Sequence, residues 1–149
     1  MQIKTILLAA ILLVGVKSFS QSKSKDFHGA VAEAKSYKAV YFINDSSARK
    51  IKSTLRNIKN ALEDPRLQGK LEVELVVFGD GVEVFKKINH YDTLLTALQS
   101  KGVLLAQCLN TMKERKIDKS ELWNFIGYVP TGNGEIIIRQ AQGWTVVHP

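Results

Sequence analysis

From residue 37 onward, short apolar runs alternate with amphipathic stretches. The apolar runs are rich in β-branched and aromatic residues, and they predict strands over residues 38–43, 71–78, 103–106, 125–129 and 144–148. Most stretches between them carry apolar residues at spacings of three and four, which predicts helices; the clearest stripe is Ile51, Leu55, Ile58 and Leu62. Strands that alternate with helices form parallel sheets covered on both faces. We therefore predict an α/β fold with three α/β/α layers around a five-stranded, mainly parallel sheet.

Three segments need separate interpretation. Residues 82–88 suit either a helical turn or a short strand, and the pattern does not decide between the two. Residues 135–138 are β-branched like a strand, but the glycines on either side bracket a helix better, so we predict a helix there. Residues 103–106 are too short and too apolar for a half-exposed strand, which predicts the buried centre of the sheet.

The first twenty residues differ from the rest of the chain. A basic start at Lys4, an apolar run that ends at Val16 and small residues at Ser18 and Ser20 are typical of a secretory signal peptide. The run of about a dozen apolar residues is shorter than the ~20 that a membrane-spanning helix needs. We expect cleavage near Ser20, no stable membrane insertion and a periplasmic or secreted protein. We interpret residues 1–20 as the signal peptide, residues 21–36 as a flexible lead-in and residues 37–149 as one domain.

The charge balance of the chain is basic. Only Lys4 and Lys17 precede the expected cleavage site, so the 21 Lys and Arg residues become 19 against 14 Asp and Glu, a net charge of +5. A basic surface suits nucleic acid, an anionic membrane surface or an acidic partner, and export argues against nucleic acid. Much of the excess projects from one side of the first predicted helix, at Arg49, Lys50, Lys52, Arg56 and Lys59. This pattern favours a solvated outer face.

The chain has one cysteine, Cys108, which follows the third predicted strand and precedes a predicted helix. Functional groups of open parallel sheets gather beyond the carboxyl ends of the strands, and the first turn of a helix offers unpaired N–H groups that favour a thiolate. A single cysteine forms no internal disulfide. Cys108 is thus a packed core residue, half of an intermolecular disulfide or a reactive thiol, and its position alone leaves these alternatives open.

Other candidate site residues lie at the same kind of strand-to-helix junction. We name Asn44, Asn110, Thr111 and Gly132 as candidate binding residues, and the glycine-rich turn that contains Gly132 suits an anion at a helix start. That turn matches neither a phosphate-binding loop nor a dinucleotide fingerprint. The three histidines lack the spacing of metal ligands, so we predict no metal site.

The segment from Gly102 to Arg115, which reads Gly-Val-Leu-Leu-Ala-Gln-Cys-Leu-Asn-Thr-Met-Lys-Glu-Arg, resembles the cysteine segment of the DsrE/DsrF-like family of sulfur-relay proteins. The order of the other elements over residues 37–149 is similar to that family too. The resemblance implies homo-oligomers or hetero-oligomers, often trimeric or hexameric, and a cysteine that carries sulfur as a persulfide. Only Cys108 matches that cysteine, and the resemblance implies no cofactor.

Two hypotheses from different classes follow. In the first, the protein is an exported sulfur carrier or sulfurtransferase-like protein whose Cys108 takes sulfur from a donor and yields it to an acceptor thiol. In the second, it is a non-enzymatic oligomeric module that binds a small ligand, and Cys108 is a structural residue. A role in disulfide exchange ranks lowest, because the chain has no second cysteine to resolve a mixed disulfide.

Overall fold

The computed structural model describes residues 27–149. The predicted signal peptide and the start of the predicted lead-in lie outside the described residues. The chain divides into one unit of residues 1–30 and a second unit of residues 31–149. In the first unit the described residues, 27–30, form neither helix nor strand, and every element below belongs to the second unit.

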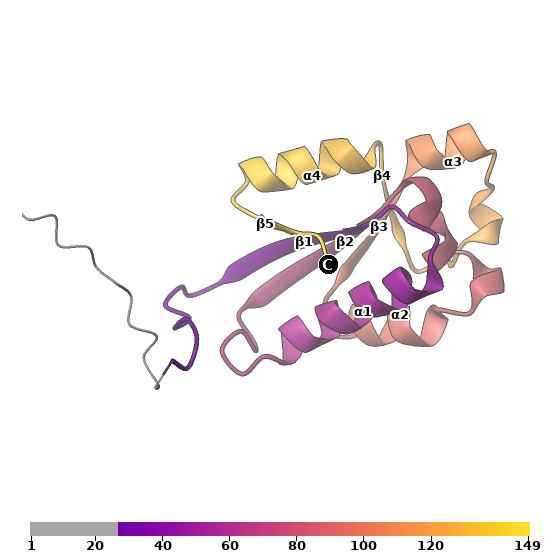
Figure 1. The fold of residues 1–149 in the computed structure, drawn as a ribbon. Coiled ribbons are helices and arrows are strands. Elements are labelled where there is room, and N and C mark those ends of the chain that lie inside the picture. Colours follow the sequence, from indigo (N-terminus) through magenta and orange to yellow (C-terminus); the bar gives the residue numbers. More distant parts are fainter. Residues whose placement is uncertain (1–26) are drawn as a thin grey trace, which may run out of the picture. The chain divides into compact units, whose positions relative to one another are not determined.

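The second unit is built on one parallel sheet. Its strands are β1 Tyr37–Ile43, β2 Leu71–Val77, β3 Leu104–Cys108, β4 Gly127–Val129 and β5 Thr145–Val147. They lie in the order β4-β3-β2-β1-β5, and all neighbours are parallel (Figure 1). The predicted five-stranded α/β fold is therefore confirmed, although the two edge strands, β4 and β5, have only three residues each.

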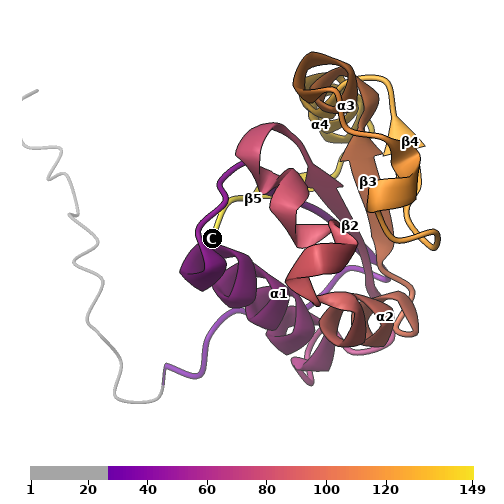
Figure 2. The same cartoon turned by 90° about the vertical axis from the view of Figure 1, so that its right-hand side faces the viewer.

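Helices cover both faces of the sheet. They are α1 Ala48–Glu63, α2 Asp92–Gln99, α3 Leu109–Arg115 and α4 Gly132–Ala141. Figures 1 and 2 show α1 and α2 on one face and α3 and α4 on the other, which gives the three predicted layers. The helix predicted over residues 135–138 is confirmed as part of α4. The undecided segment, residues 82–88, includes the end of one short 3-10 helix, Gly79–Val84, and the start of another, Lys87–Asn89. Between them Lys86 forms an isolated antiparallel bridge with Leu122. A third 3-10 helix, Lys119–Glu121, precedes β4.

The main core lies between the sheet and the pair α1 and α2. Ile51, Leu55 and Ile58 of α1 are each at most 2% exposed and pack on alternate residues of the central strands. Burial of such a side chain contributes about 1.5–3 kcal/mol to stability, so the predicted stripe of α1 is the face that holds it to the sheet. Among the described helices, none has the length and apolar character needed to cross a membrane.

The layer on the opposite face is thinner. Helix α4 carries the chain from β4 at one edge to β5 at the other, and it packs mainly on β2 and β5. Its core consists of few buried residues, namely Val40, Val76, Ala106 and Trp144. As a result, Leu104 of β3 is 51% exposed. The expectation of a wholly buried strand is right for Leu105 and Ala106 and wrong for Leu104, because α4 lies mainly over other strands.

A tight turn follows β2 and passes close to the end of β1. The N–H of Phe78 donates to the carbonyl oxygen of Ile43, with an N to O distance of 3.1 Å. A Cβ atom on Gly81 would lie 2.1 Å from that same oxygen. Gly79 adopts a positive φ of 55°, a conformation that favours glycine. This turn therefore requires glycine at both positions, for two different physical reasons.

Gly81→Ala is expected to destabilise the fold by about 3 kcal/mol, because the added methyl group displaces the backbone of β1. Gly69→Ala is the control: its φ is +75° but no atom lies within 4 Å of the added Cβ, so only the cost of the left-handed backbone, about 1 kcal/mol, is expected. Urea unfolding measures both. Equal losses in the two variants would contradict the close approach as the cause.

Candidate functional site

Cys108 is the last residue of β3 and the N-cap residue of α3. Its Sγ atom accepts a hydrogen bond from the backbone N–H of Thr111, with an N to S distance of 3.3 Å. The residue is only 3% exposed. The sulfur thus lies at the start of a helix, where an N–H dipole points at it and stabilises negative charge, but it is covered from solvent.

Thr111 connects this cysteine to the turn after β2. Its hydroxyl oxygen accepts a hydrogen bond from the N–H of Gly79 at 2.9 Å, and the residue is 4% exposed. One residue therefore donates its N–H to the sulfur of Cys108 and holds the backbone of Gly79. The position of the sulfur relative to the end of β2 depends on this double contact.

The other three predicted binding residues lie around this pair without bonding to the sulfur. Asn110 is exposed, and its side-chain amide donates to Glu114 Oε1 at 2.8 Å. Gly132 is buried against Phe78, whose ring would lie 2.6 Å from a Cβ at that position. Asn44 is exposed. It lies beside the turn, because its carbonyl oxygen would be 3.6 Å from a Cβ atom on Gly79. Within residues 27–149, no hydrogen bond links any of the three to Cys108.

Sequence reasoning missed the contributions of Gly79 and Phe78 to the site. Gly79 anchors Thr111, and Phe78 supplies the surface on which Gly132 packs. The sequence feature that could have indicated these two residues is the Gly-Asp-Gly turn at the carboxyl end of the second predicted strand. In a parallel sheet such a turn lies beside the end of the neighbouring strand, here the strand that ends in Cys108.

The charged residues of α3 are directed elsewhere. Arg115 pairs with Asp80 of the turn, with an N to O distance of 2.8 Å. Lys113 and Lys116 are exposed. The positive influence on the sulfur of Cys108 that the structure defines is therefore the helix start itself. Among the described residues, no group of three or more His, Cys, Asp and Glu side chains is placed to hold a metal ion.

Gln107 fixes the backbone next to the cysteine from the other side of β3. Its side chain is fully buried, and its Nε2 donates to the carbonyl oxygen of Cys108 at 3.0 Å. Adjacent strand residues point to opposite faces, so this amide lies on the α1 and α2 side while the Cys108 side chain lies on the other. The junction between β3 and α3 is therefore held from both faces.

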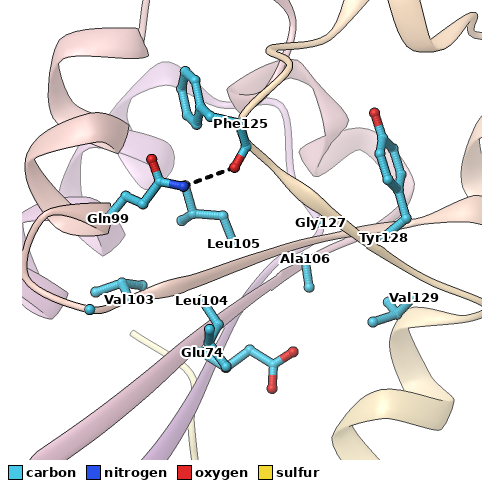
Figure 3. A pocket seen from close by; sticks show the side chains of 11 residues that line it. Glu74, Gln99, Val103, Leu104, Leu105, Ala106, Phe125, Gly127, Tyr128 and Val129 are labelled. Carbon is cyan, nitrogen blue, oxygen red and sulfur yellow. Dashed lines mark hydrogen bonds between the residues drawn. The ribbon is translucent and has the colours of Figure 1, made fainter.

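A separate pocket of about 390 Å³ lies beside β3 and β4. Figure 3 shows Leu104 and Glu74 together on one side of β3. On the other side, the Gln99 amide donates to the carbonyl oxygen of Phe125 at 2.9 Å, the contact drawn as a dashed line (Figure 3). Cys108 is not part of this pocket's lining.

Glu74 is the unusual residue of that pocket, because its side chain is only 3% exposed in the middle of a sheet. Arg139 of α4 donates its Nε–H to Glu74 Oε2, and the same nitrogen forms an ion pair with Glu135 at 2.9 Å. The Arg139 guanidinium lies 4.6 Å from the centre of the Trp144 ring. Burial raises the pKa of Glu74, and the charge of Arg139 opposes that rise. The pair anchors α4 to the sheet.

The fold and the cysteine junction place this chain among open parallel α/β proteins whose candidate site lies at the carboxyl ends of the strands. The family model of the DsrE/DsrF-like family matches residues 23–149. The chain therefore belongs to the DsrE/DsrF-like family, which confirms the resemblance seen in the sequence. The match begins within the predicted lead-in.

Solved structures support the same fold. The chain is similar to MTH1491 of Methanobacterium thermoautotrophicum, a protein of unknown function, with a TM-score of 0.71 and 26% identity over 76% of this chain and 99% of the other. It is also similar to BT1422 of Bacteroides thetaiotaomicron, a conserved protein of unknown function, with a TM-score of 0.62 and 10% identity over 81% and 100% of the two chains. The comparison with curated proteins found no match.

Thr111→Val is expected to destabilise the protein by about 1–3 kcal/mol, because the N–H of Gly79 loses its acceptor in a partly buried place. Thr111→Ser keeps the hydroxyl and should recover most of that loss. Urea unfolding of the two variants beside the unmodified protein provides the measurement. If serine costs as much as valine, keeping the hydroxyl does not restore stability, and the hydrogen bond to Gly79 does not explain the effect.

Proposed function

We propose that this protein is a sulfur carrier of the sulfur-relay type and that Cys108 is the residue that accepts sulfur, as a persulfide. Membership of the DsrE/DsrF-like family supports a relay-type role. The observation that carries the proposal is the hydrogen bond from the N–H of Thr111 to Cys108 Sγ. It gives the sulfur a fixed donor that stabilises the anion needed for attack.

The transfer needs no cofactor and no net oxidation. The Cys108 thiolate attacks the outer sulfur of a donor persulfide, a new S–S bond forms, and the donor's own S–S bond breaks. The donor leaves as a thiolate, and the outer sulfur now sits on Cys108. An acceptor thiolate attacks that sulfur in turn, which releases the Cys108 thiolate. The Thr111 N–H lies within reach of Sγ in both thiolate states.

The burial of Cys108 favours a second candidate function. A sulfur that is 3% exposed suits a structural residue, and the protein would then be an oligomeric module that binds a small ligand without chemistry. For the carrier, access requires a displacement of the start of α3, where Leu109 is already 38% exposed. The two candidates therefore differ in whether the folded protein lets a reagent reach Sγ.

We also propose that the protein is exported to the periplasm or secreted. Support comes from the basic start, the apolar run and the small residues before position 21. Outside the cytoplasm an exposed persulfide is open to oxidation. A covered sulfur such as that of Cys108 suits this setting better than an exposed one.

Incubation of the folded protein with a low-molecular-weight persulfide is expected to add the mass of one sulfur atom, which a reducing thiol removes again. Intact-mass spectrometry under native conditions makes the measurement, with Cys108→Ser as the matched control that gains nothing. In parallel, iodoacetamide should label Cys108 in the folded protein, because a carrier has to let a reagent reach Sγ.

Two results together would favour the binding module instead. The first is the absence of a sulfur adduct on the folded protein. The second is alkylation of Cys108 only after unfolding in urea. A sulfur adduct that forms equally on Cys108→Ser would show that the sulfur is held elsewhere and would also reject Cys108 as the carrier.

We propose that the face of the sheet beside β3 and β4 mediates self-association into the trimer or hexamer expected for the family. Leu104 is 51% exposed on a central strand, and Ile138 of α4 is 53% exposed. The pocket beside β3 and β4 is lined by Leu104 and Glu74. A second copy on this face would cover apolar surface that a single chain leaves in contact with water.

Leu104→Asp is expected to shift the protein to a monomer, because it puts a charge at the centre of the proposed contact. Leu94→Asp on α2 is the matched control, since Leu94 is 46% exposed on the opposite side of the sheet. Light scattering coupled to size exclusion measures the mass of each. A monomeric unmodified protein, or equal dissociation in both variants, would reject this face as the interface.

A further inference from the structure

A second surface of the protein combines apolar side chains with a row of positively charged side chains. It is the groove between α1 and α2, with a volume of about 390 Å³. Its floor is apolar: Leu55 and Leu98 are 2% and 3% exposed, and Leu94 stands 46% exposed at the side. Figure 2 shows α1 and α2 on the face of the sheet opposite α4, so this α1–α2 groove belongs to that face.

The α1 side of the groove is lined by cations. Lys52, Arg56 and Lys59 follow one another at spacings of four and three residues, so they form a single row about 10 Å long on the helix. Within residues 27–149, none of the three has an ion pair or hydrogen bond with an acidic side chain. Like charges at these spacings weaken a helix, so the row does not serve the stability of α1.

The α2 side of the groove is nearly neutral. It is lined by Thr93 and Ala97, and its one cation, Lys101, pairs with Glu63 at 3.1 Å. In the part of the chain that the structure describes, no acidic residue lines the groove. The surface is therefore an apolar trough with one strongly basic side, and this asymmetry is the property that a partner has to match.

We propose that the α1–α2 groove docks an amphipathic helix of a partner protein. The apolar face of that helix fills the trough, and a row of Asp or Glu residues at spacings of four and three pairs with Lys52, Arg56 and Lys59. Helix-in-groove recognition uses such anchors at one face of the bound helix. The complementary charge sets the direction and register of the bound helix.

Three observations favour this occupant over others. The charge is spread along a line, so a ligand with a single anionic group would leave most of the row unmatched. The apolar surface is concave, whereas a membrane surface would need protruding apolar side chains, and Leu94 alone stands out among the groove residues. A second copy of this chain would bring the same cationic row against itself, in a protein whose net charge is still +5 after the expected cleavage.

The inference stands independently of the sulfur-carrier proposal. The groove shares no residue with the cysteine junction or with the pocket beside β3 and β4. A partner held in the groove would leave the proposed self-association face open. The same copy of the chain could thus take part in an oligomer and hold a partner helix at the same time.

The experiment uses the full folded chain and a synthetic helical peptide as the probe. The peptide has leucines on one face and three glutamates at spacings of four and three beside them, and a fluorophore reports binding by anisotropy. A second peptide with the same composition in scrambled order is the probe control. We expect the ordered peptide to bind at least about tenfold more tightly than the scrambled one, a difference that falls as salt rises.

Variants of the protein locate the binding. Lys52→Glu, Arg56→Glu and Lys59→Glu combined should weaken binding at least about tenfold. The matched control changes the charge equally elsewhere, with Lys70→Glu, Lys113→Glu and Lys116→Glu combined, three exposed cations outside the groove.

On the apolar side, Leu94→Asp should weaken binding while Leu104→Asp should not. Circular dichroism and urea unfolding confirm that each variant folds.

The inference is overturned if both triple variants weaken binding equally, because the attraction would then be a general charge effect. It is also overturned if the scrambled peptide binds as well as the ordered one. Vesicles of phosphatidylcholine with and without phosphatidylglycerol form a third arm. If the anionic vesicles bind through the groove cations and the ordered peptide does not bind, the groove faces a membrane surface and the helix proposal is wrong.

Discussion

The turn from Phe78 to Gly81 is the constraint on which the candidate site depends. Its backbone approaches the end of β1 so closely that Gly81 faces the carbonyl oxygen of Ile43 without room for a side chain. From the same turn, the N–H of Gly79 reaches the hydroxyl of Thr111. The turn thereby brings together the end of β1, the end of β2 and the start of α3 at the carboxyl end of the sheet. The environment of Cys108 follows from that contact, and not from residues adjacent to it in the sequence alone.

The two faces of the sheet differ because of the order of the strands. The chain forms β1 to β4 in steps toward one edge and then returns with α4 to place β5 at the other edge. The long connection through α4 thus crosses the second face, which it shares with α3, and it needs a strong anchor to hold it there. The ion pair of Arg139 with the buried Glu74 provides that anchor. Breaking one partner of such a pair leaves the other charge buried and unpaired, which is costly.

Much of the fold was predictable because it is encoded at short range. The apolar stripe from Ile51 to Leu62 and the apolar run from Leu71 to Phe78 each lie within one short segment. The spacing of their apolar residues is therefore enough to identify a helix and a strand. The exposure of Leu104 was not predictable, since it depends on which strands a distant helix covers. The sequence did hold one unused signal: a glutamate inside an apolar strand, Glu74, indicates a buried partner.

For the site, the position of Cys108 at a strand end was predictable, and its burial was not. The first depends on the local alternation of strand and helix, whereas the second depends on how α3 and the loops beside it pack. The contact of Thr111 with Gly79 joins residues 32 positions apart. No local pattern specifies such a pair, although a glycine turn after one strand and a threonine after the next are the components it requires.

The short edge strands of the sheet affect how readily the protein can aggregate. Both edge strands, β4 and β5, have three residues, so each offers only a short row of free N–H and C=O groups to a strand from another chain. Short edge strands are one way in which natural proteins prevent sheets from pairing edge to edge into fibres. The proposed export would take the protein beyond the reach of cytoplasmic chaperones. Resistance to strand-by-strand aggregation would then be a property that the fold itself has to provide.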